Sequence, residues 1–247
     1  MMMGLLRLSY IVFWSTLVAL MCPFASLVSY GFGISHEHTT HRLFQYWASK
    51  ATKFTHSCLG DALTVSGPAL TEPPTIITAN HASWIDICLL VTLYQKQLPV
   101  MLFVLKKQLM YVPLFGYVAY LMGCPLLSRS GHRADIKAIQ NAVKSAPHAC
   151  LVIFPEGTRF SKEKRNLYQH ILDPKGAGIS IIAKSQKKTR WLDCHIYYEN
   201  PPSIFNFLMG KQGKVSVLSE WVNPIEKDSI NKQWNRKEAW LSDQCNT

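Results

Sequence analysis

The residues that decide the fold are Thr75-Ile76-Ile77-Thr78-Ala79-Asn80-His81-Ala82-Ser83-Trp84-Ile85-Asp86, an apolar run that leads through a short polar stretch into a helical pattern. The apolar run predicts a strand over residues 75–79, and the pattern after it predicts a helix over about 84–93. His81 and Asp86 are five residues apart, which on one straight helix would place them about 140° apart, on different faces. The spacing is satisfied if His81 lies in the turn after the strand and Asp86 lies in the first turn of the helix. From there the carboxylate can reach a ring nitrogen, fix the tautomer of His81 and stabilise its protonated form.

Such a junction also has an ordinary structural explanation, because three of its residues are common at helix N-caps and in turns: Asn80, Ser83 and Asp86. A second stretch favours a functional site over this structural explanation. It is Phe154-Pro155-Glu156-Gly157-Thr158-Arg159-Phe160-Ser161, which continues an apolar run at residues 150–154. In α/β sheets, functional side chains lie at the carboxyl ends of strands. Gly157 permits a tight or left-handed backbone at this point, and Thr158 and Arg159 offer a hydroxyl and a guanidinium as donors. By itself, this stretch is equally compatible with a tight turn whose charged side chains are solvated.

Strand-like and helix-like patterns alternate along the rest of the chain. We predict further strands at residues 100–104, 125–127, 150–154, 191–198 and 214–222. We predict further helices at about 41–54, 113–122, 134–145, 176–184 and 236–242. This alternation indicates an α/β fold with a largely parallel sheet flanked by helices.

The N-terminal segment is apolar and almost uncharged. Arg7 is the only Lys, Arg, Asp or Glu before residue 36, and the uncharged run 8–35 is long enough to cross a bilayer. Pro23 lies inside this run, so one spanning helix and a kinked helical pair lying in one leaflet both remain open. A secretory signal peptide is disfavoured, because the apolar run is too long and no clear cleavage site follows it. We therefore predict a membrane-anchoring helical segment over residues 1–34 and one folded domain over residues 35–247.

Residues 108–127 also lack Lys, Arg, Asp and Glu and could be taken for a second membrane span. A single additional span would place His81 and Arg159 on opposite sides of the bilayer. Glycines and prolines interrupt the run. We therefore expect a buried or membrane-contacting helix followed by a strand.

The charge balance points to an anionic partner. The 247-residue chain has 26 Lys and Arg against 15 Asp and Glu, a formal net charge of +11, and 48% of its residues are hydrophobic. No nucleic-acid motif and no nucleotide-binding glycine pattern accompany this charge. Together with the apolar N-terminal segment, the charge favours an anionic membrane surface over nucleic acid.

The cysteines and histidines predict neither a disulfide framework nor a metal site. The seven cysteines are scattered without a C-x-x-C pair, so we expect reduced, buried thiols in a cytoplasmic environment. The histidines show no convincing ligand spacing, and the three at 36, 38 and 41 are expected to be an exposed segment beside the membrane.

Taken together, the two polar stretches resemble the lysophospholipid acyltransferase family, and most nearly its 1-acylglycerol-3-phosphate acyltransferases. The resemblance rests on His81-x4-Asp86 with Asn80 before it, followed about 70 residues later by Phe-Pro-Glu-Gly-Thr-Arg. It covers roughly residues 75–222.

Further similarity lies between and after these motifs. Lys106-x6-Pro113-x2-Gly116 and residues 123–129 resemble the middle block of the family, and residues 174–178 resemble a basic, glycine-rich helix start of some members. Two departures stand in the middle block, at Pro125 and Ser128. A third is residues 191–198, which lack the proline usual in the fourth block and look more like the branch that contains lysocardiolipin acyltransferases. These departures leave the head-group specificity open.

The resemblance implies a mechanism and a set of binding residues. His81 would be the general base on the free hydroxyl of a lysophospholipid, and Asp86 would orient it. The hydroxyl oxygen would attack the thioester carbon of an acyl donor, without a covalent enzyme intermediate. Seven further residues would bind substrate, with Lys106, Arg129 and Arg159 facing its phosphate: Asn80, Lys106, Arg129, Glu156, Gly157, Thr158 and Arg159.

The resemblance therefore implies a membrane-bound O-acyltransferase that converts lysophosphatidic acid into phosphatidic acid. The expected co-substrate is acyl-CoA or acyl carrier protein, with no cofactor, no metal and no nucleic acid. Residues 35–247 would be a glycerolipid acyltransferase domain facing the cytoplasm, since the usual donors are intracellular. Two alternatives remain: reacylation of another lysophospholipid, such as lysocardiolipin or lysophosphatidylglycerol, and a non-enzymatic basic lipid-binding protein.

Overall fold

The computed structural model describes residues 2–32, 36–70, 72, 73, 75–98, 100–112, 115–128, 133–146, 148–185, 190–223 and 229–246. The chain forms two compact units. The first unit contains Met1–Ser57 and Cys88–Leu151, and the second contains Cys58–Ile87 and Val152–Thr247.

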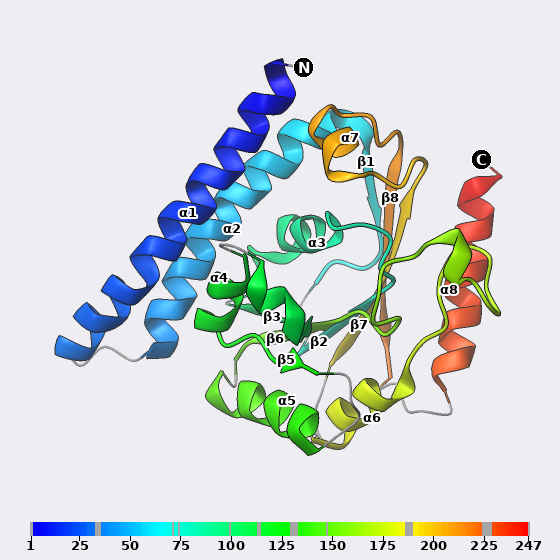
Figure 1. The fold of residues 1–247 in the computed structure, drawn as a ribbon. Helices are drawn as coiled ribbons and strands as arrows, with labels where there is room; N and C mark the ends of the chain where they lie inside the picture. The colour runs from blue at the N-terminus through cyan, green and yellow to red at the C-terminus, as the bar shows by residue number, and fades with distance from the viewer. Residues whose placement is uncertain are drawn as a thin grey trace. The chain divides into compact units, whose positions relative to one another are not determined.

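The second unit is built on four neighbouring strands, in the order β1 (Leu63–Ser66), β8 (Val215–Val222), β7 (Trp191–Tyr198) and β2 (Ile76–Ala79) (Figure 1). β1 is parallel to β8, and β2 is parallel to β7, whereas β7 and β8 are antiparallel. The second half of β6 (Cys150–Ile153) follows β2 in the sheet. Because β2 and β7 are parallel, their carboxyl ends lie at the same edge, where side chains of both strands can meet.

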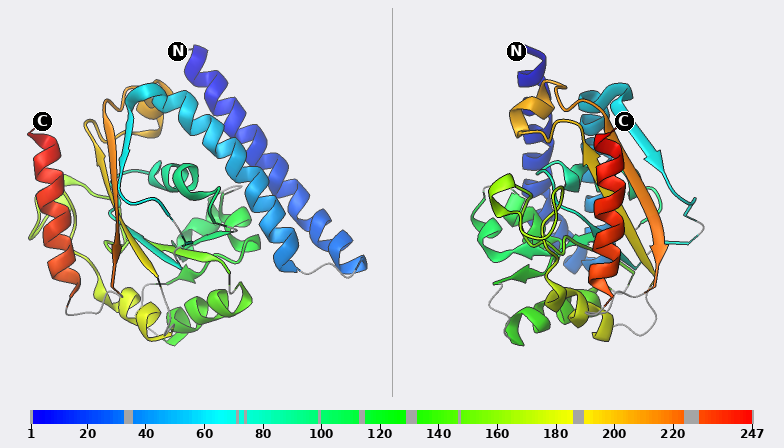
Figure 2. Two further views of the ribbon diagram at one scale, coloured as in Figure 1. Left: turned by 180° about the vertical axis from the view of Figure 1, so that it is seen from behind. Right: turned by 90° about the vertical axis from the view of Figure 1, so that its right-hand side faces the viewer.

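Helices complete the second unit. α8 (Ile230–Cys245) packs on β7, and its Trp234 is fully buried, so β7 is covered and buried along nearly its whole length (Figure 2). The other helices are α6 (Gly176–Ser185), α7 (Ile204–Leu208), η1 (Gly60–Ala62) and η3 (Lys162–Lys164). The buried interior includes the large apolar residues Ile76, Ile77, Trp191, Phe207 and Trp234.

The first unit contains the N-terminal helices α1 (Met2–Gly31) and α2 (His36–Leu59), most of α3 (Asp86–Tyr94), and α5 (Arg133–Ser145). Its strand β3 (Met101–Phe103) neighbours the first half of β6. The remaining elements are β4 (Leu105–Lys106), η2 (Lys107–Tyr111), α4 (Phe115–Leu121) and β5 (Leu126–Leu127), with β4 and β5 forming a parallel pair of their own. Its buried residues include Phe44, Leu89, Leu90, Met101 and Ile139.

The predicted α/β fold with a largely parallel sheet is confirmed, and β7 has the predicted bounds. α2 and α8 are longer than predicted, because polar residues interrupt the apolar pattern toward their ends. β1 lies where no strand is predicted, since its alternation of apolar and polar residues, Leu-Thr-Val-Ser, extends over only four positions, most of them exposed. The predicted helix and strand within residues 108–127 are confirmed as α4 and β5, preceded by the short helix η2.

α1 and α2 lie side by side as a helical hairpin (Figures 1 and 2). α1 is one helix through Pro23, so a break into two shorter segments is not found. Trp14 of α1 packs edge to face on Tyr46 of α2, with ring centroids 5.6 Å apart. Lys50 Nζ lies 4.0 Å from the centroid of the Trp14 ring.

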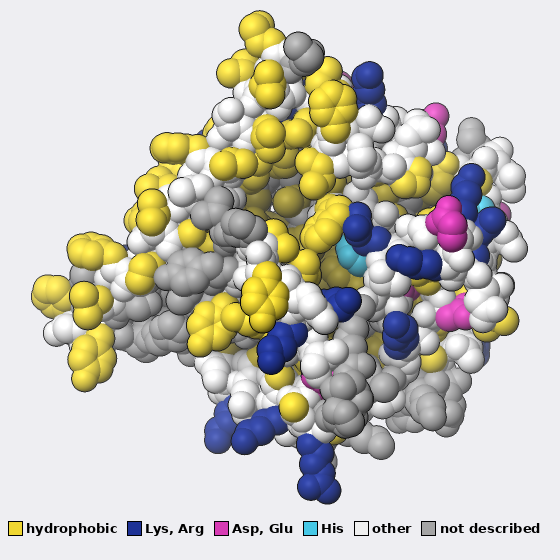
Figure 3. All heavy atoms as spheres, viewed as in Figure 1, with side chains coloured by type: hydrophobic (Ala, Val, Ile, Leu, Met, Phe, Trp, Pro, Cys, Tyr) yellow, Lys and Arg dark blue, Asp and Glu magenta, His cyan; other side chains and the backbone are white. Residues whose placement is uncertain are grey.

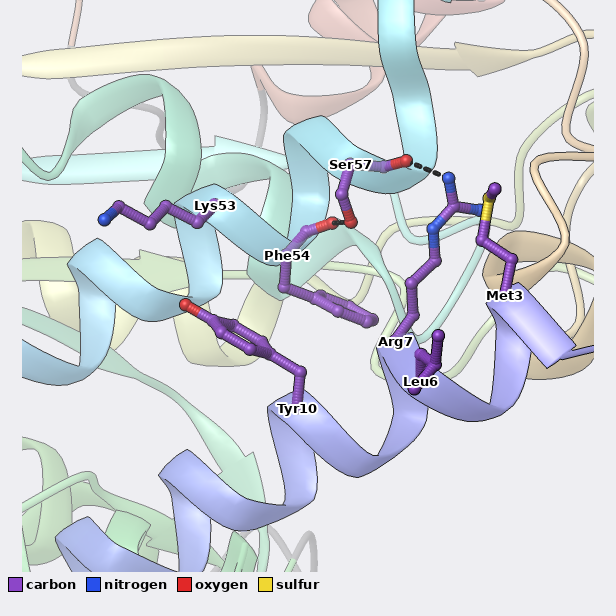
Figure 4. Close-up of a pocket in the computed structure, with 7 residues that line it drawn as sticks. All are labelled: Met3, Leu6, Arg7, Tyr10, Lys53, Phe54 and Ser57. Atoms are coloured by element: carbon purple, nitrogen blue, oxygen red, sulfur yellow. Dashed lines mark hydrogen bonds between the residues drawn. The ribbon is translucent and has the colours of Figure 1, made fainter.

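Most large apolar side chains of α1 are exposed (Figure 3). In the part of the chain that the structure describes, Met2–Ala25 is the one stretch of helix long and apolar enough to cross a membrane. A cavity of about 440 Å³ lies between α1 and α2 and is lined by Met3, Leu6, Arg7, Tyr10, Lys53, Phe54 and Ser57 (Figure 4). The Arg7 guanidinium donates to the carbonyl of Ser57 across it.

Candidate active site

His81 and Asp86 meet as the spacing predicts. β2 ends at Ala79, His81 lies in the turn that follows, and α3 begins at Asp86. His81 Nδ1 lies 2.8 Å from Asp86 Oδ2. The His81 side chain is 17% exposed and the Asp86 side chain is fully buried. No residue that the structure describes bonds the other ring nitrogen, Nε2.

The Asp86 carboxylate is surrounded by four donors. Besides His81 Nδ1, Oδ2 accepts the backbone N–H groups of Ala82 and Ser83, at 2.8 and 2.9 Å. The other oxygen, Oδ1, accepts the hydroxyl of Tyr198 at 2.8 Å. A buried carboxylate needs this degree of satisfaction, because an unpaired charge in the interior is strongly destabilising. The carboxylate is therefore held in one orientation toward His81.

Two aromatic residues of the loop after β6 hold the His81 segment. The Phe154 ring stacks on the imidazole, with centroids 4.3 Å apart and an interplanar angle of 21°. The backbone N–H of Phe160 donates to the His81 carbonyl at 2.7 Å. The imidazole plane is thus set by an apolar contact on its face as well as by Asp86 on its edge.

Glu156 is buried next to the backbone of His81. Its side chain is 1% exposed, and Oε1 accepts the backbone N–H of His81 at 3.0 Å. Burial raises the pKa of Glu156 to about 8, although the His81 hydrogen bond and the charge of Lys237 act to lower it. This geometry favours a role in positioning the His81 backbone over the predicted contact with substrate.

The raised pKa predicts a pH-dependent effect of Glu156→Gln on stability. The folded-state pKa of about 8 lies above the ordinary value of 4.5. The stabilisation from the protonated carboxyl is therefore complete below about pH 4.5 and is lost progressively as the pH rises toward 8. Glutamine stays neutral throughout. The free energy of unfolding of the variant, relative to that of the wild type, should therefore rise by on the order of 3 kcal/mol between pH 5 and pH 8.

Denaturant unfolding of both proteins at pH 5 and pH 8 measures this difference. Glu163→Gln is the matched control, because Glu163 is exposed in the loop after β6 and its substitution should change the comparison little. Parallel stability curves for wild type and Glu156→Gln would mean that Glu156 is ionised in the fold.

Asn80 holds the end of β2 on β7. Its side-chain amide donates to the carbonyl of Ile196 and accepts the N–H of Ile196, each at 2.8 Å. The side chain is 2% exposed. With both ends of its amide engaged, Asn80 is better suited to fixing the strand that carries His81 than to the predicted substrate contact.

The turn after β6 presents Gly157, Thr158 and Arg159. Gly157 has φ 68°, a left-handed conformation that glycine adopts without strain, and its N–H closes the turn on the carbonyl of Phe154. The Thr158 hydroxyl accepts from Lys164 Nζ at 3.5 Å. Arg159 is exposed and its guanidinium lies 4.4 Å from the centroid of the Trp84 ring. The aromatic face orients this cation beside the junction that carries His81 and Asp86.

Two predicted phosphate-binding residues lie outside the described part of the second unit. Lys106 is the exposed last residue of β4 and belongs to the first unit. Arg129 lies outside the described residues.

A buried charge cluster that was not predicted supports β7. Asp193 Oδ1 accepts from Lys237 Nζ at 2.8 Å and from the Thr78 hydroxyl at 2.6 Å, and Lys237 Nζ also donates to the Cys194 carbonyl. Lys237 is fully buried. Burial alone would raise the pKa of Asp193, but Lys237 and His195 outweigh it and lower that pKa to about 2. The cluster thus ties α8 to β7, and β7 to β2 three residues before His81.

A family model described as Acyltransferase matches residues 62–217, which include His81, Asp86, Glu156 and Tyr198 but not α1 or α8. A 1-acyl-sn-glycerol-3-phosphate acyltransferase of Cocos nucifera is 33% identical over 103 residues, covering 41% of this chain and 32% of the relative. The 1-acyl-sn-glycerol-3-phosphate acyltransferase epsilon of Mus musculus is 25% identical over 198 residues, covering 67% of this chain and 53% of the relative. The chain thus spans about a third to a half of the length of these two relatives.

Two further similarities are to a plant protein and to a solved structure. The lysophospholipid acyltransferase LPEAT1 of Arabidopsis thaliana is 32% identical over 105 residues, covering 37% of this chain and 25% of the relative. The crystal structure of the 1-acyl-sn-glycerophosphate (LPA) acyltransferase PlsC from Thermotoga maritima superposes with a TM-score of 0.55 and 18% identity, covering 98% of this chain and 96% of that one. At this identity the structural likeness shows a shared fold.

Proposed function

Because the chain belongs to the acyltransferase family, we propose that it transfers a fatty acyl group from a thioester donor to the free hydroxyl of lysophosphatidic acid, forming phosphatidic acid. The observation that carries this proposal is the His81–Asp86 pair, with 2.8 Å between Nδ1 and Oδ2 and with Nε2 left for the hydroxyl of the acceptor. Relatives named as 1-acyl-sn-glycerol-3-phosphate acyltransferases support the choice of acceptor.

The proposed reaction needs one base and no covalent enzyme intermediate. His81 Nε2 takes the proton of the acceptor hydroxyl while its oxygen attacks the thioester carbon. The carbon–sulfur bond of the resulting tetrahedral intermediate then breaks, and the imidazolium returns the proton to the departing thiolate. Asp86 keeps the proton of the neutral imidazole on Nδ1 and stabilises the imidazolium between these two steps.

The acceptor phosphate is proposed to bind Arg159. This guanidinium is exposed and oriented by Trp84, and it follows the strand end beside His81. Arg159→Ala is expected to raise KM for lysophosphatidic acid about 10- to 100-fold and to leave KM for the acyl donor within about twofold, because a charge-assisted contact to phosphate is lost.

Steady-state kinetics with each substrate varied in turn test this prediction. Arg236→Ala is the control, since Arg236 is an exposed arginine of α8 for which no contact with either substrate is proposed. Equal losses for both substrates in Arg159→Ala would contradict a role specific to the acceptor.

The proposed donor is acyl-CoA or acyl carrier protein. Both are anionic, and the loop after β6 exposes Lys162, Lys164 and Arg165 next in sequence to Arg159. Lys and Arg side chains gather over this loop in Figure 3. Their charge supports a role in attracting an anionic donor.

Membrane attachment is proposed to occur through the α1–α2 hairpin lying in one leaflet, with the remainder of the chain on the cytoplasmic side. Lys50 of α2 lies against Trp14, near the middle of the apolar stretch Met2–Ala25. If α1 crossed the bilayer upright, this ammonium would lie close to the bilayer centre, at a cost of about 2.5–3.5 kcal/mol. A hairpin in the interface lets Lys50 and Lys53 reach water while the apolar face of α1 is immersed.

Single cysteines introduced at Met3 and at Phe32 of a cysteine-free protein distinguish the two arrangements. Reaction of both with a membrane-impermeant thiol reagent from the same side of a vesicle is expected. Reaction from opposite sides would mean that α1 spans the bilayer.

A second acceptor class is favoured by two observations. Residues 191–198 lack the proline usual in the fourth family block, and a plant relative is named as a lysophospholipid acyltransferase without restriction to lysophosphatidic acid. The alternative function is reacylation of a lysophospholipid with a larger head group, such as lysophosphatidylglycerol or lysocardiolipin.

Acyl transfer by the purified protein in detergent tests the proposed function. The protein is offered labelled acyl-CoA and, in turn, lysophosphatidic acid, lysophosphatidylglycerol, lysophosphatidylethanolamine and lysocardiolipin. Product from lysophosphatidic acid alone is the expected result. Product from another acceptor would select the alternative, and no product with either acyl-CoA or acyl carrier protein as donor would favour a basic lipid-binding protein.

A further inference from the structure

Tyr198 is the last residue of β7 and has no part in the proposed reaction as described so far. Its ring is buried, with 4% exposure, and its hydroxyl lies 2.8 Å from Asp86 Oδ1. A phenol donates one hydrogen bond, and a carboxylate only accepts. Tyr198 is therefore a donor to the carboxylate oxygen opposite the one that faces His81.

β7 is held so that its final residue reaches this position. Lys237 and Thr78 bind Asp193 near the start of the strand. Asn80 exchanges two hydrogen bonds with the backbone of Ile196, two residues before Tyr198. Because side chains alternate along a strand, Ile196 and Tyr198 share a face while Tyr197 points to the other. The register between β2 and β7, which positions the turn that carries His81, thus also positions the Tyr198 hydroxyl.

We propose that Tyr198 is a positioning residue for acyl transfer, which holds the Asp86 carboxylate in the orientation that makes His81 a base. This inference rests on the proposed function. Oδ2 has three donors of its own, so rotation of the carboxylate about its Cβ–Cγ bond is opposed on one side by the β2–α3 turn and on the other by Tyr198.

Tyr198 also affects the negative charge on the Asp86 oxygen that faces His81. A hydrogen bond to Oδ1 withdraws part of the negative charge of the carboxylate, and its loss leaves more charge at Oδ2 to stabilise the imidazolium. Two further ionisable groups act on this part of the structure: Glu156, which accepts from the His81 N–H, and Lys237 of α8, whose charge acts on Glu156. Tyr198→Phe leaves both in place.

Tyr198→Phe removes one oxygen and keeps the ring, so it is the variant to measure. We expect kcat to fall about 10-fold with KM for both substrates unchanged, because the lost contact is a charge-assisted hydrogen bond away from the substrate. We also expect the acidic limb of the pH–rate profile to move upward by about half a pH unit or more, because the imidazolium is favoured.

Tyr197→Phe is the matched control, the same chemical change one residue away on the opposite face of the same strand. It should leave kcat and the pH profile unaltered. A loss of thermal stability in Tyr198→Phe with an unchanged pH profile and kcat would overturn the positioning role and leave Tyr198 as a packing residue.

A second readout does not need turnover. The rate at which diethyl pyrocarbonate modifies His81, followed by mass spectrometry against pH, reports the neutral imidazole directly. In Tyr198→Phe the modification curve should move to higher pH by the same amount as the rate profile. If wild type shows no transfer to any acceptor but this shift is seen, the proposed reaction fails while the Tyr198 contact stands. If transfer is found and the shift is absent, the inference about Tyr198 is the part that is wrong.

Discussion

Replacing His81 with alanine is expected to lower kcat for acyl transfer by about 10³-fold, because positioned general-base catalysis contributes typically 10²–10⁴-fold. KM for the acyl donor should change little, since the imidazole acts on the acceptor hydroxyl. The protein should remain folded, because the His81 side chain is partly exposed and its loss removes only one of the four donors to Asp86. Single-turnover and steady-state rates with the best acceptor of the panel measure the effect.

His148→Ala is the control for this substitution. His148 is exposed, so the kcat of the His148→Ala variant should equal that of the wild type. Vesicle binding of the His81 variant should also be unchanged, because the α1–α2 hairpin is intact. A His81→Ala protein that keeps more than a tenth of the wild-type kcat would exclude His81 as the base.

Asp86→Asn is expected to lower kcat by about as much, on the order of 10³-fold, for a different reason. The carboxylate accepts from His81, Ala82, Ser83 and Tyr198, and an amide offers only one accepting oxygen. Its NH₂ group must face a donor or turn the histidine to the other tautomer, which moves the proton to the nitrogen that should act as base. Stability should fall too, by about 1–3 kcal/mol, because buried N–H groups lose their acceptor.

The catalytic and structural losses of Asp86→Asn can be separated. Activity is measured at a temperature where denaturant unfolding shows the variant to be fully folded. Asp61→Asn is the control, since Asp61 is exposed in η1 and is expected to leave both quantities unchanged. A folded Asp86→Asn protein with kcat within tenfold of wild type would remove Asp86 from the proposed mechanism.

The contact between His81 and Asp86 was predictable because it is local. Strand, turn and helix follow one another within residues 75–94, and the turn alone brings His81 and Asp86 together. The elements around them were predictable for a similar reason, since burial in a parallel sheet requires apolar runs such as those of β2 and β6.

The roles of Asn80 and Glu156 were harder to predict from the sequence. Both are polar residues beside the motif, and residue type alone suggested that they bind substrate. In the structure they are buried and bond the backbone of Ile196 and of His81. A buried polar side chain that bonds the backbone positions the chain and is not available to a substrate. Its burial depends on the packing of the whole fold, which residue type does not show.

By itself, the sequence determined the α/β class, the apolar N-terminal segment, and the pairing of His81 with Asp86, because each depends on residues close together in the chain. Only the tertiary structure decided which groups complete the site. Tyr198 reaches Asp86 across 112 residues of sequence, and Lys237 reaches Asp193 across 44. Such contacts depend on strand register and on the docking of α8, and a buried charge takes its pKa from the partners that this packing supplies.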